Sequence, residues 1–236
     1  MQRYFVDIDR NGKIVFTEQD VFHISKVMRF KVDDQIEVVN DSKVYLVNID
    51  SINPLNVHII KNLECNAELP SKVTLFIPLL KSDKSELIIQ KATELGVSSI
   101  IFFNSKRSII KLDDKDFNKK LVRYNAIAKE ASEQCHRNII PSISGVINLS
   151  NIDKYMCDTN LFAYEVTHGS TSSLYDSIKN HGSYSIIVGP EGGFDESEAK
   201  ILLEKKFIPV SLGNRILRVE TAAIYSLSVI AFNLEK

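Results

Sequence analysis

The stretch Ile187–Phe194, IVGPEGGF, places three glycines and a proline directly after an apolar run. Asp195 and Glu198 then have the spacing of a capping box, so we expect a helix to begin there. An apolar strand, a glycine turn and a helix in succession are typical of a parallel α/β sheet, where ligands bind beyond the carboxyl ends of the strands. Glu191 within the turn would repel phosphate, so the loop predicts a neutral or cationic ligand.

A second glycine loop follows in the same way further along the chain. The run 207–213, FIPVSLG, is a predicted strand, and NRILRVETAA leads from it into a terminal helix. That helix, TAAIYSLSVIAFNLEK, is apolar almost all round, which predicts burial on more than one side. Packing in the core of one chain and packing in a homodimer both explain this pattern.

Strands and helices alternate from residue 71 onward. The apolar runs 73–80, 97–105, 159–165 and 183–189 are predicted strands of one parallel sheet. Between them, Asp83 and Glu86 have capping-box spacing, and Gly96 stands where a helix C′ glycine belongs. One face of a second, long helix is marked by Phe117, Leu121, Tyr124, Ala128, Ala131 and Cys135.

The first 70 residues have a different pattern, which predicts a small β-barrel. Short runs rich in Val, Ile and aromatic residues are separated by polar turns such as DRNG, KVDD and SINP. Only residues 20–30, DVFHISKVMRF, have a helical pattern. The polar segment ECNAELPSK makes a plausible hinge near residue 70, so the predicted domains are 1–70 and 71–236.

Composition and charge place the chain among globular proteins with ample core. The 236 residues carry a net charge of −1, and the three cysteines form no CxxC motif, which favours a reducing compartment and disfavours a metal site. No run is long and apolar enough to span a membrane, and the N-terminus has no apolar signal region, so the expected location is the cytoplasm. Residues 79–140 contain 12 Lys/Arg against 8 Asp/Glu, which permits a local polyanion-binding surface.

Several common ligand-binding motifs are absent from the sequence. No GxG occurs, which excludes the dinucleotide fingerprint and the usual glycine motif of open-sheet methyltransferases. GxxxxGK[ST], HExxH and GxSxG are absent as well.

The combination of GPEGGF with LGNRILRVETAA resembles the paired C-terminal motifs of the SPOUT class of methyltransferases. The chain is most similar to the family that methylates N(3) of a uridine in 16S (small-subunit) ribosomal RNA. MQRYFV, HISKVMRF, LLKSDKSELIIQKATELGV, KRSII, EASEQCHRNIIP and FAYE follow in that family's order, so the resemblance covers nearly the whole chain. It implies an α/β-knot domain with a parallel sheet and a deep trefoil knot, an N-terminal PUA-like β-barrel that binds RNA, and a homodimer.

The resemblance also implies S-adenosylmethionine (SAM) as the cofactor, held by the two glycine loops. SAM carries a positive sulfur and no phosphate, which fits a loop that contains Glu191 and lacks lysine. The implied cofactor-binding residues are Gly189, Glu191, Gly192, Leu212, Gly213, Ile216, Leu217 and Arg218.

Methylation at a uracil ring nitrogen requires loss of a proton and stabilisation of charge on the uracil oxygens. Arg218 is the first candidate for the second role, because its guanidinium presents a fork of donors; an ion pair with Glu220 is the alternative. Glu191 and Glu220 are the candidate bases, followed by His136.

The partner implied by the resemblance is small-subunit ribosomal RNA or the 30S particle, with no membrane and no metal. Candidate RNA contacts come from both predicted domains: Arg3, His23, Arg29, Lys81, Lys84, Arg107, Gln134 and Arg137. Two alternatives remain open. One is a SPOUT methyltransferase for another nucleoside of ribosomal or transfer RNA, and the other is a non-catalytic ribosome-assembly factor that binds SAM.

Overall fold

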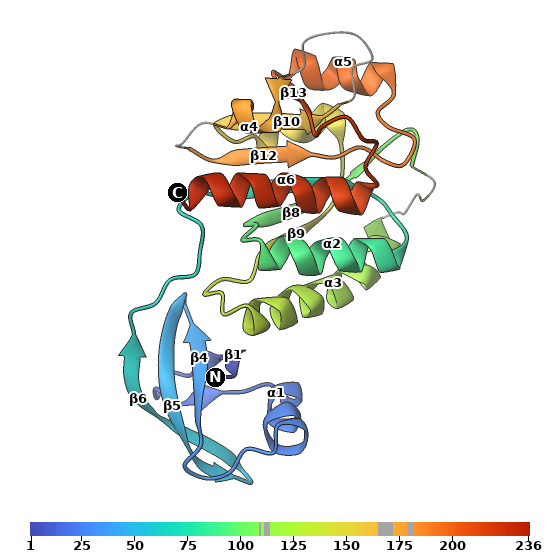
Figure 1. Cartoon of the computed structure of the whole chain (residues 1–236). Coiled ribbons are helices and arrows are strands. Elements are labelled where there is room, and N and C mark those ends of the chain that lie inside the picture. The colour runs from blue at the N-terminus through green and yellow to red at the C-terminus, as the bar shows by residue number, and fades with distance from the viewer. Residues whose placement is uncertain (109, 111–113, 165–171, 179–181) are drawn as a thin grey trace. The chain divides into compact units, whose positions relative to one another are not determined.

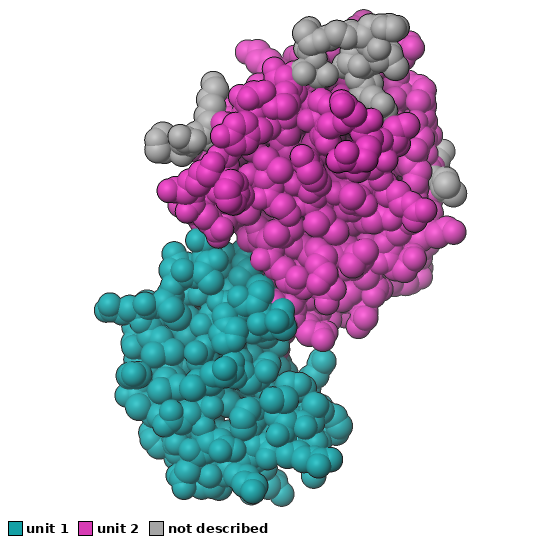
Figure 2. Space-filling view, viewed as in Figure 1, with its two compact units in different colours: residues 1–68, 132–139 teal, residues 69–131, 140–236 magenta. Residues whose placement is uncertain are grey.

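The computed structural model describes residues 1–108, 110, 114–164, 172–178 and 182–236. The chain divides into two compact units, which Figure 2 shows in different colours. Unit 1 consists of residues 1–68 and 132–139, and unit 2 consists of residues 69–131 and 140–236. Glu165, at the end of one predicted strand, lies outside the described residues.

A seven-stranded sheet in the order β11-β13-β10-β12-β7-β8-β9 forms the centre of unit 2 (Figure 1). Each neighbouring pair of strands is parallel, which confirms the predicted parallel α/β sheet. Five strands fall in predicted apolar runs, whereas β9 and the two-residue β11 were not predicted. The strands are β7 (Val73–Pro78), β8 (Ser99–Asn104), β9 (Ser142–Asn148), β10 (Thr159–Ala163), β11 (Ser172–Ser173), β12 (Tyr184–Ile187) and β13 (Ile208–Ser211).

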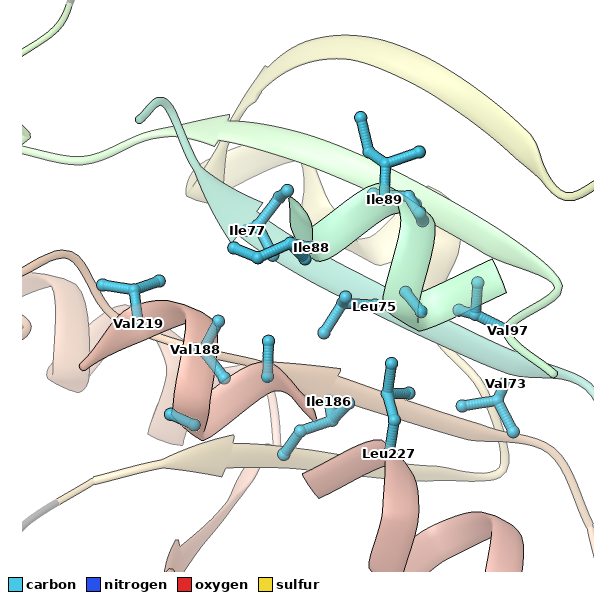
Figure 3. Packing of buried hydrophobic residues seen from close by; sticks show 14 of the residues in the cluster. Val73, Leu75, Ile77, Ile88, Ile89, Val97, Ile186, Val188, Val219 and Leu227 are labelled. Carbon is cyan, nitrogen blue, oxygen red and sulfur yellow. The ribbon is translucent and has the colours of Figure 1, made fainter. Parts of the chain in front are cut away.

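Strand β7 is buried on both faces, as its uninterrupted apolar run requires. Val73, Leu75 and Ile77 point to one face, where they pack against α2 (Ser82–Glu94) and α6 (Val219–Leu234) (Figure 3). Phe76 points to the other face, into a cluster that includes residues of α5 (Glu196–Glu204) and the 3₁₀ helix η2 (Leu149–Tyr155). The sheet is therefore covered on both sides by helices.

Helix α2 begins earlier than predicted. The expected capping box at Asp83 and Glu86 is wrong, because the helix already starts at Ser82 with Lys81 as an N-cap that makes no side-chain hydrogen bond. The predicted end is confirmed: Gly96 follows the C-cap at φ +84°, and Val97 N–H donates to Ala92 O at 3.0 Å.

The two remaining long helices cover the same face of the sheet as α2. Helix α3 (Asp114–Gln134) packs there through the predicted stripe, of which Phe117, Tyr124 and Ala128 are fully buried. Helix α6 buries one side against the core but leaves Phe232 63% exposed. The predicted burial of α6 on more than one side is therefore not achieved within a single chain. Between β11 and β12 lies the short helix α4 (Leu174–Ser177).

Unit 1 contains a four-stranded sheet in the order β1-β4-β5-β6 and a two-stranded sheet of β2 and β3. Its core is formed by buried aliphatic side chains together with Tyr4. The predicted helical segment is helical but irregular, because α1 continues directly into a π-helix, η1. The elements are β1 (Arg3–Phe5), β2 (Asp7–Ile8), β3 (Ile14–Val15), α1 (Glu18–Phe22), η1 (His23–Val27), β4 (Gln35–Asn40), β5 (Lys43–Ile52) and β6 (Leu55–Leu63).

Candidate active site

The two glycine loops enclose one cavity of about 530 Å³ in unit 2. The loops follow β12 and β13, which both pair with β10 in parallel, so they leave the sheet at the same edge. The cavity is lined by residues 189–194, 210–213 and 215–217, together with Arg107, Ala163, Tyr164, Glu196, Val219 and Ala222.

The first loop is a tight turn held by its own backbone. Gly193 N–H donates to Pro190 O at 2.8 Å, and Gly193 has φ +68°, a value that favours glycine. A Cβ at Gly189 would lie 3.1 Å from the ring of Phe194, so the absence of a side chain there lets the buried ring pack against the loop.

The loop ends where α5 begins, and the capping box predicted at this point is confirmed. Asp195 accepts from Ser197 N–H at 3.1 Å, while Glu198 accepts from Asp195 N–H at 2.9 Å. The hydrogen bonds from Ser197 are the largest cause of the lowered pKa of the Asp195 carboxyl.

The second loop depends on Gly213, whose φ of +107° is rarely adopted by residues with a side chain. Its N–H is 3.2 Å from the hydroxyl of Ser211. The chain then reaches Arg218, which is the N-cap of α6 without a side-chain capping bond. Its exposed guanidinium is thus not required to cap the helix.

A lysine and two carboxylates meet beside the cavity. Lys84, in the first turn of α2, donates a hydrogen bond to Glu191 Oε1 at 2.7 Å, and its Nζ lies 4.0 Å from Glu220 Oε2. This hydrogen bond is the main reason why the pKa of Glu191 lies below its usual value, and it also raises the pKa of Lys84. Glu191 is therefore ionised at neutral pH.

Arg107, between β8 and α3, packs over the first glycine loop. Its Nη1 donates to Gly192 O at 3.0 Å, and its Nη2 lies 3.6 Å from Asp195 Oδ2. The segment that carries Arg107 is held by the buried Glu198, which accepts from Lys106 N–H at 2.9 Å. The same carboxylate therefore caps α5 and fixes the residues next to Arg107.

The structure brings most of the predicted cofactor-binding residues together around the cavity. Gly189, Glu191, Gly192, Leu212, Gly213, Ile216 and Leu217 line it. Of the three catalytic candidates, Glu191 lines the cavity, whereas Arg218 and Glu220 lie at the adjacent start of α6. Glu220 Oε2 is buried and has no hydrogen-bond partner among the described residues.

Two of the predicted RNA contacts are buried inside unit 1. Arg3 is 3% exposed and pairs with Glu37 at 2.8 Å, and Arg137 is 2% exposed and pairs with Glu68 at 2.5 Å. His136, the last of the candidate bases, also belongs to unit 1 and lies 3.3 Å from Glu37. The geometry favours structural roles for both arginines.

The sequence EQCHRN places Arg137 in this position because it forms the end of α3. His136 has φ +60°, and Arg137 N–H donates to Ser132 O at 2.9 Å, which is the hydrogen bond of a Schellman cap. Glu68 then accepts from the backbone of Asn138 and Ile139 at 2.9 and 3.1 Å. The turn is therefore fixed from both sides within unit 1.

The other RNA candidates are more accessible. Arg29, Lys81, Arg107 and Gln134 are exposed, and Arg29 has φ +55°. His23 is half-buried and its Nδ1 lies 2.9 Å from Tyr4 Oη. Lys84 in unit 2 is half-buried, and its ammonium is paired with Glu191.

The sequence did not predict several side chains that line the cavity. Tyr164 and Arg215 occur in motifs of the resembled family, FAYE and GNRILR, so the signal was present but not assigned to the site. Phe194 and Val219 are apolar residues at the ends of the two loops, where a sequence pattern cannot separate a lining residue from a core residue.

Two features are absent from the described part of the chain. No group of three or more His, Cys, Asp and Glu side chains there is arranged to hold a metal ion. No helix in the same part is long and apolar enough to cross a membrane.

Comparison with known proteins reveals two family matches along the chain. Residues 67–231 match an RNA methyltransferase domain, and residues 16–61 match an RNA methyltransferase PUA domain.

Individual relatives match over almost their full length. The chain is 38% identical to ribosomal RNA small subunit methyltransferase E of Bacillus subtilis, covering 100% of this chain and 98% of that protein. It is 35% identical to the protein of the same name from Mesomycoplasma hyopneumoniae, covering 97% and 98%. A crystal structure of ribosomal RNA small subunit methyltransferase E from Neisseria gonorrhoeae bound to S-adenosyl methionine superposes with a TM-score of 0.84 at 26% identity, covering 97% of this chain and 96% of that one.

Proposed function

Since the chain belongs to the ribosomal RNA small subunit methyltransferase E family, we propose that it uses SAM to methylate N(3) of a uridine in 16S ribosomal RNA. The observation that supports this most strongly is the cavity of about 530 Å³ between two glycine loops, with an ionised carboxylate and no lysine on its lining. Cavities of several hundred Å³ accommodate ligands of the size of SAM.

The lining carries the carboxylates of Glu191 and Glu196 and the guanidinium groups of Arg107 and Arg215, and the cavity has the size that SAM needs. The absence of a side chain at Gly192 lets Arg107 pack against the first loop, because a Cβ there would lie 3.3 Å from the Arg107 side chain. The Glu191 carboxylate provides a negative charge for the positive sulfur. The proposed binding residues remain Gly189, Glu191, Gly192, Leu212, Gly213, Ile216, Leu217 and Arg218, the last through its main chain. Bound SAM supplies an electrophilic methyl group.

Arg218 stabilises the uracil during the reaction. Formation of the N(3)–carbon bond requires loss of the N(3) proton, and negative charge then develops on the two neighbouring oxygens. Arg218 is exposed at the start of α6, next to the cavity lining at Leu217, and its guanidinium presents donors in a planar fork. The proton is accepted by one of two carboxylates, Glu191 or Glu220, which Glu→Gln substitutions separate.

RNA is held by exposed cations of both units. Arg29, Lys81 and Arg107, with His23 and Gln134, keep the proposed role, whereas Arg3 and Arg137 support the fold of unit 1. Residues 1–70 form a PUA-like β-barrel that binds RNA, and residues 71–236 form the knotted SPOUT domain, except for residues 132–139, which belong to unit 1. The family match to an RNA methyltransferase PUA domain at residues 16–61 supports the first assignment.

The salt dependence of RNA binding tests the role of Arg29. The logarithm of the association constant for 16S RNA should fall linearly with the logarithm of salt concentration, and Arg29→Ala should reduce the magnitude of that slope by about 0.7 to 0.9 for one lost phosphate contact. Arg10→Ala removes another exposed arginine of unit 1 and should leave the slope unchanged. Filter binding at several salt concentrations measures both, and equal slopes for Arg29→Ala and wild type would exclude the contact.

The exposed side of α6 supports a homodimer. Tyr225 and Phe232, which are 43% and 63% exposed, leave an apolar surface on a helix that is otherwise packed in the core. A second copy of the chain covers this surface and completes the burial that the helix sequence predicted. The proposed location is the cytoplasm.

The conformation of Gly213 should control the affinity for SAM. Gly213→Ala has open space around its Cβ, so its effect comes from the φ of +107° alone. If the alanine variant relaxes away from this φ when free, SAM binding must restore a strain of about 1–3 kcal/mol, which corresponds to an affinity about 5- to 150-fold weaker. Gly12→Ala is the matched control, because Gly12 also has positive φ and open surroundings but lies in unit 1. Calorimetric titration with SAM should show the loss only for Gly213→Ala; equal affinities would separate this loop from the cofactor.

Methyl transfer to RNA tests the proposed function itself. The full chain is incubated with methyl-labelled SAM and either 16S RNA or 30S particles that lack the modification, and the RNA is digested to nucleosides. Label in 3-methyluridine is the expected result. Label in another nucleoside would support the alternative SPOUT specificity. SAM binding without any transfer to either substrate would support the non-catalytic assembly factor.

A further inference from the structure

Lys84 lies where three segments of unit 2 converge. Strands β7 and β12 are parallel neighbours, so the first turn of α2 and the glycine loop 189–194 leave the sheet at the same edge. The first turn of α6, which contains Glu220, reaches the same place. Lys84 Nζ connects all three, at 2.7 Å from Glu191 Oε1 and 4.0 Å from Glu220 Oε2.

The surroundings of Lys84 are not those of a lysine that is available to bind phosphate. Its side chain is only 26% exposed, and that of Glu220 is 15% exposed. Because Glu220 Oε2 has no hydrogen-bond partner in the described structure, the Lys84 ammonium is its nearest compensating charge. Binding a phosphate would draw the ammonium away from two carboxylates, one of them largely buried.

We propose that Lys84 is a positioning residue: its ammonium holds the Glu191 carboxylate at the edge of the cavity and compensates Glu220, so that the two glycine loops keep the arrangement that binds SAM. This assignment rests on the proposed function, because it assumes that SAM occupies the cavity. It replaces the RNA-binding role that the sequence predicted for Lys84.

The charges around Glu191 determine how its pKa should change when the ion pair with Lys84 is lost. Lys84 faces it from α2 and has the largest effect, and Lys81 at the start of the same helix has a smaller effect of the same sign. Glu220 and Arg218 from α6 act on the Lys84 ammonium with opposite signs. Lys84 lowers the pKa of Glu191, so a neutral residue at position 84 should let that pKa rise.

The ionisation of Glu191 determines how SAM affinity should depend on pH. The ionised carboxylate favours the positive cofactor, so SAM affinity is present above the pKa of Glu191 and falls as the pH drops through it. In the wild type this loss lies below the usual glutamate range. In Lys84→Met the loss should begin at a higher pH than in the wild type, because the ammonium that lowers the pKa of Glu191 is gone.

The experiment is a calorimetric titration of SAM into the full-length protein at pH values between about 3 and 7.5, a range that extends well below the usual glutamate pKa. The acid limb is the range of pH over which SAM affinity falls on acidification. Lys84→Met should move this limb to higher pH, and Lys84→Arg should move it back, because the positive charge at position 84 is restored. Lys91→Met is the matched control: it removes a lysine of the same helix that pairs with Glu94 at 2.8 Å, and it should leave the limb in place.

A double variant separates positioning from general destabilisation. If Lys84 sets the pH dependence through Glu191, then Lys84→Met should cause no further shift of the acid limb once Glu191→Gln is present. Lys84→Gln serves as a second neutral variant if Lys84→Met unfolds over part of the pH range.

An acid limb that is unchanged in both neutral variants would overturn the proposal. So would a reduced salt slope for RNA binding in Lys84→Met, which is the signature of a lost phosphate contact. A wild type that binds no SAM at any pH would instead contradict the proposed function, so the two failures are distinguishable.

Discussion

Replacement of Arg218 by alanine is expected to lower kcat for methyl transfer about 100- to 1,000-fold, the usual effect of losing one donor to a developing oxyanion. The side chain makes no capping bond to α6 and is exposed, so the fold should not depend on it. SAM affinity should be largely retained, because a cofactor contact through the main chain of Arg218 survives the substitution. Single-turnover transfer with saturating SAM and RNA measures the loss directly.

Two further variants test whether the loss of activity is specific to the guanidinium of Arg218. Arg218→Lys keeps the positive charge but not the planar fork, so its rate should lie between those of Arg218→Ala and the wild type. Arg123→Ala removes an exposed arginine of α3 that pairs with Glu86, and it should transfer at the normal rate. Turnover by Arg218→Ala close to that of the wild type would remove Arg218 from the mechanism.

Arg137→Ala is expected to destabilise unit 1 by about 3–5 kcal/mol, the usual cost of breaking a buried ion pair from one side. The guanidinium is 2% exposed and reaches Glu68 through two nitrogens, with Nε 3.1 Å and Nη2 2.5 Å from Oε2. Without it, the Glu68 carboxylate remains largely buried and keeps only its backbone donors. Urea unfolding followed by circular dichroism measures the loss.

The exposed pair of Arg123 with Glu86 is again the control. These side chains are 64% and 32% exposed, so Arg123→Ala should cost at most about 1 kcal/mol. If Arg137→Ala were as stable as the wild type but bound RNA less tightly, Arg137 would be an RNA contact after all. The structure predicts instead that Arg137→Ala lowers stability much more than Arg123→Ala does.

Local sequence patterns were sufficient for much of unit 2. The apolar run 73–80 predicted a strand buried on both faces because burial on both faces leaves no polar alternation in the sequence. The capping box at Asp195 was predicted because all of its hydrogen bonds lie within three residues. Strand β9, Ser142–Asn148, was missed because it is an edge strand of mixed, half-buried residues that has neither a continuous apolar run nor strict alternation.

Electrostatic pairs between distant residues could not be predicted in this way. Lys84 and Glu191 are separated by 107 positions, so a pattern that placed both at the site could not show that they form an ion pair. The ion pair of Arg137 could not be predicted for the same reason. A count of lysines and arginines cannot separate an arginine that faces solvent from one whose carboxylate partner is 69 positions away. The early start of helix α2 was missed for a local reason, because lysine, which stands at the N-cap position 81, is not a residue that predicts an N-cap.

The most direct test of the central claim is a crystal structure of the chain grown or soaked with SAM. Electron density for SAM is expected in the cavity between residues 189–194 and 210–217, with Glu191 as the protein carboxylate nearest to the sulfur. Density for SAM elsewhere on the chain, with both loops unoccupied at saturating SAM, would contradict it.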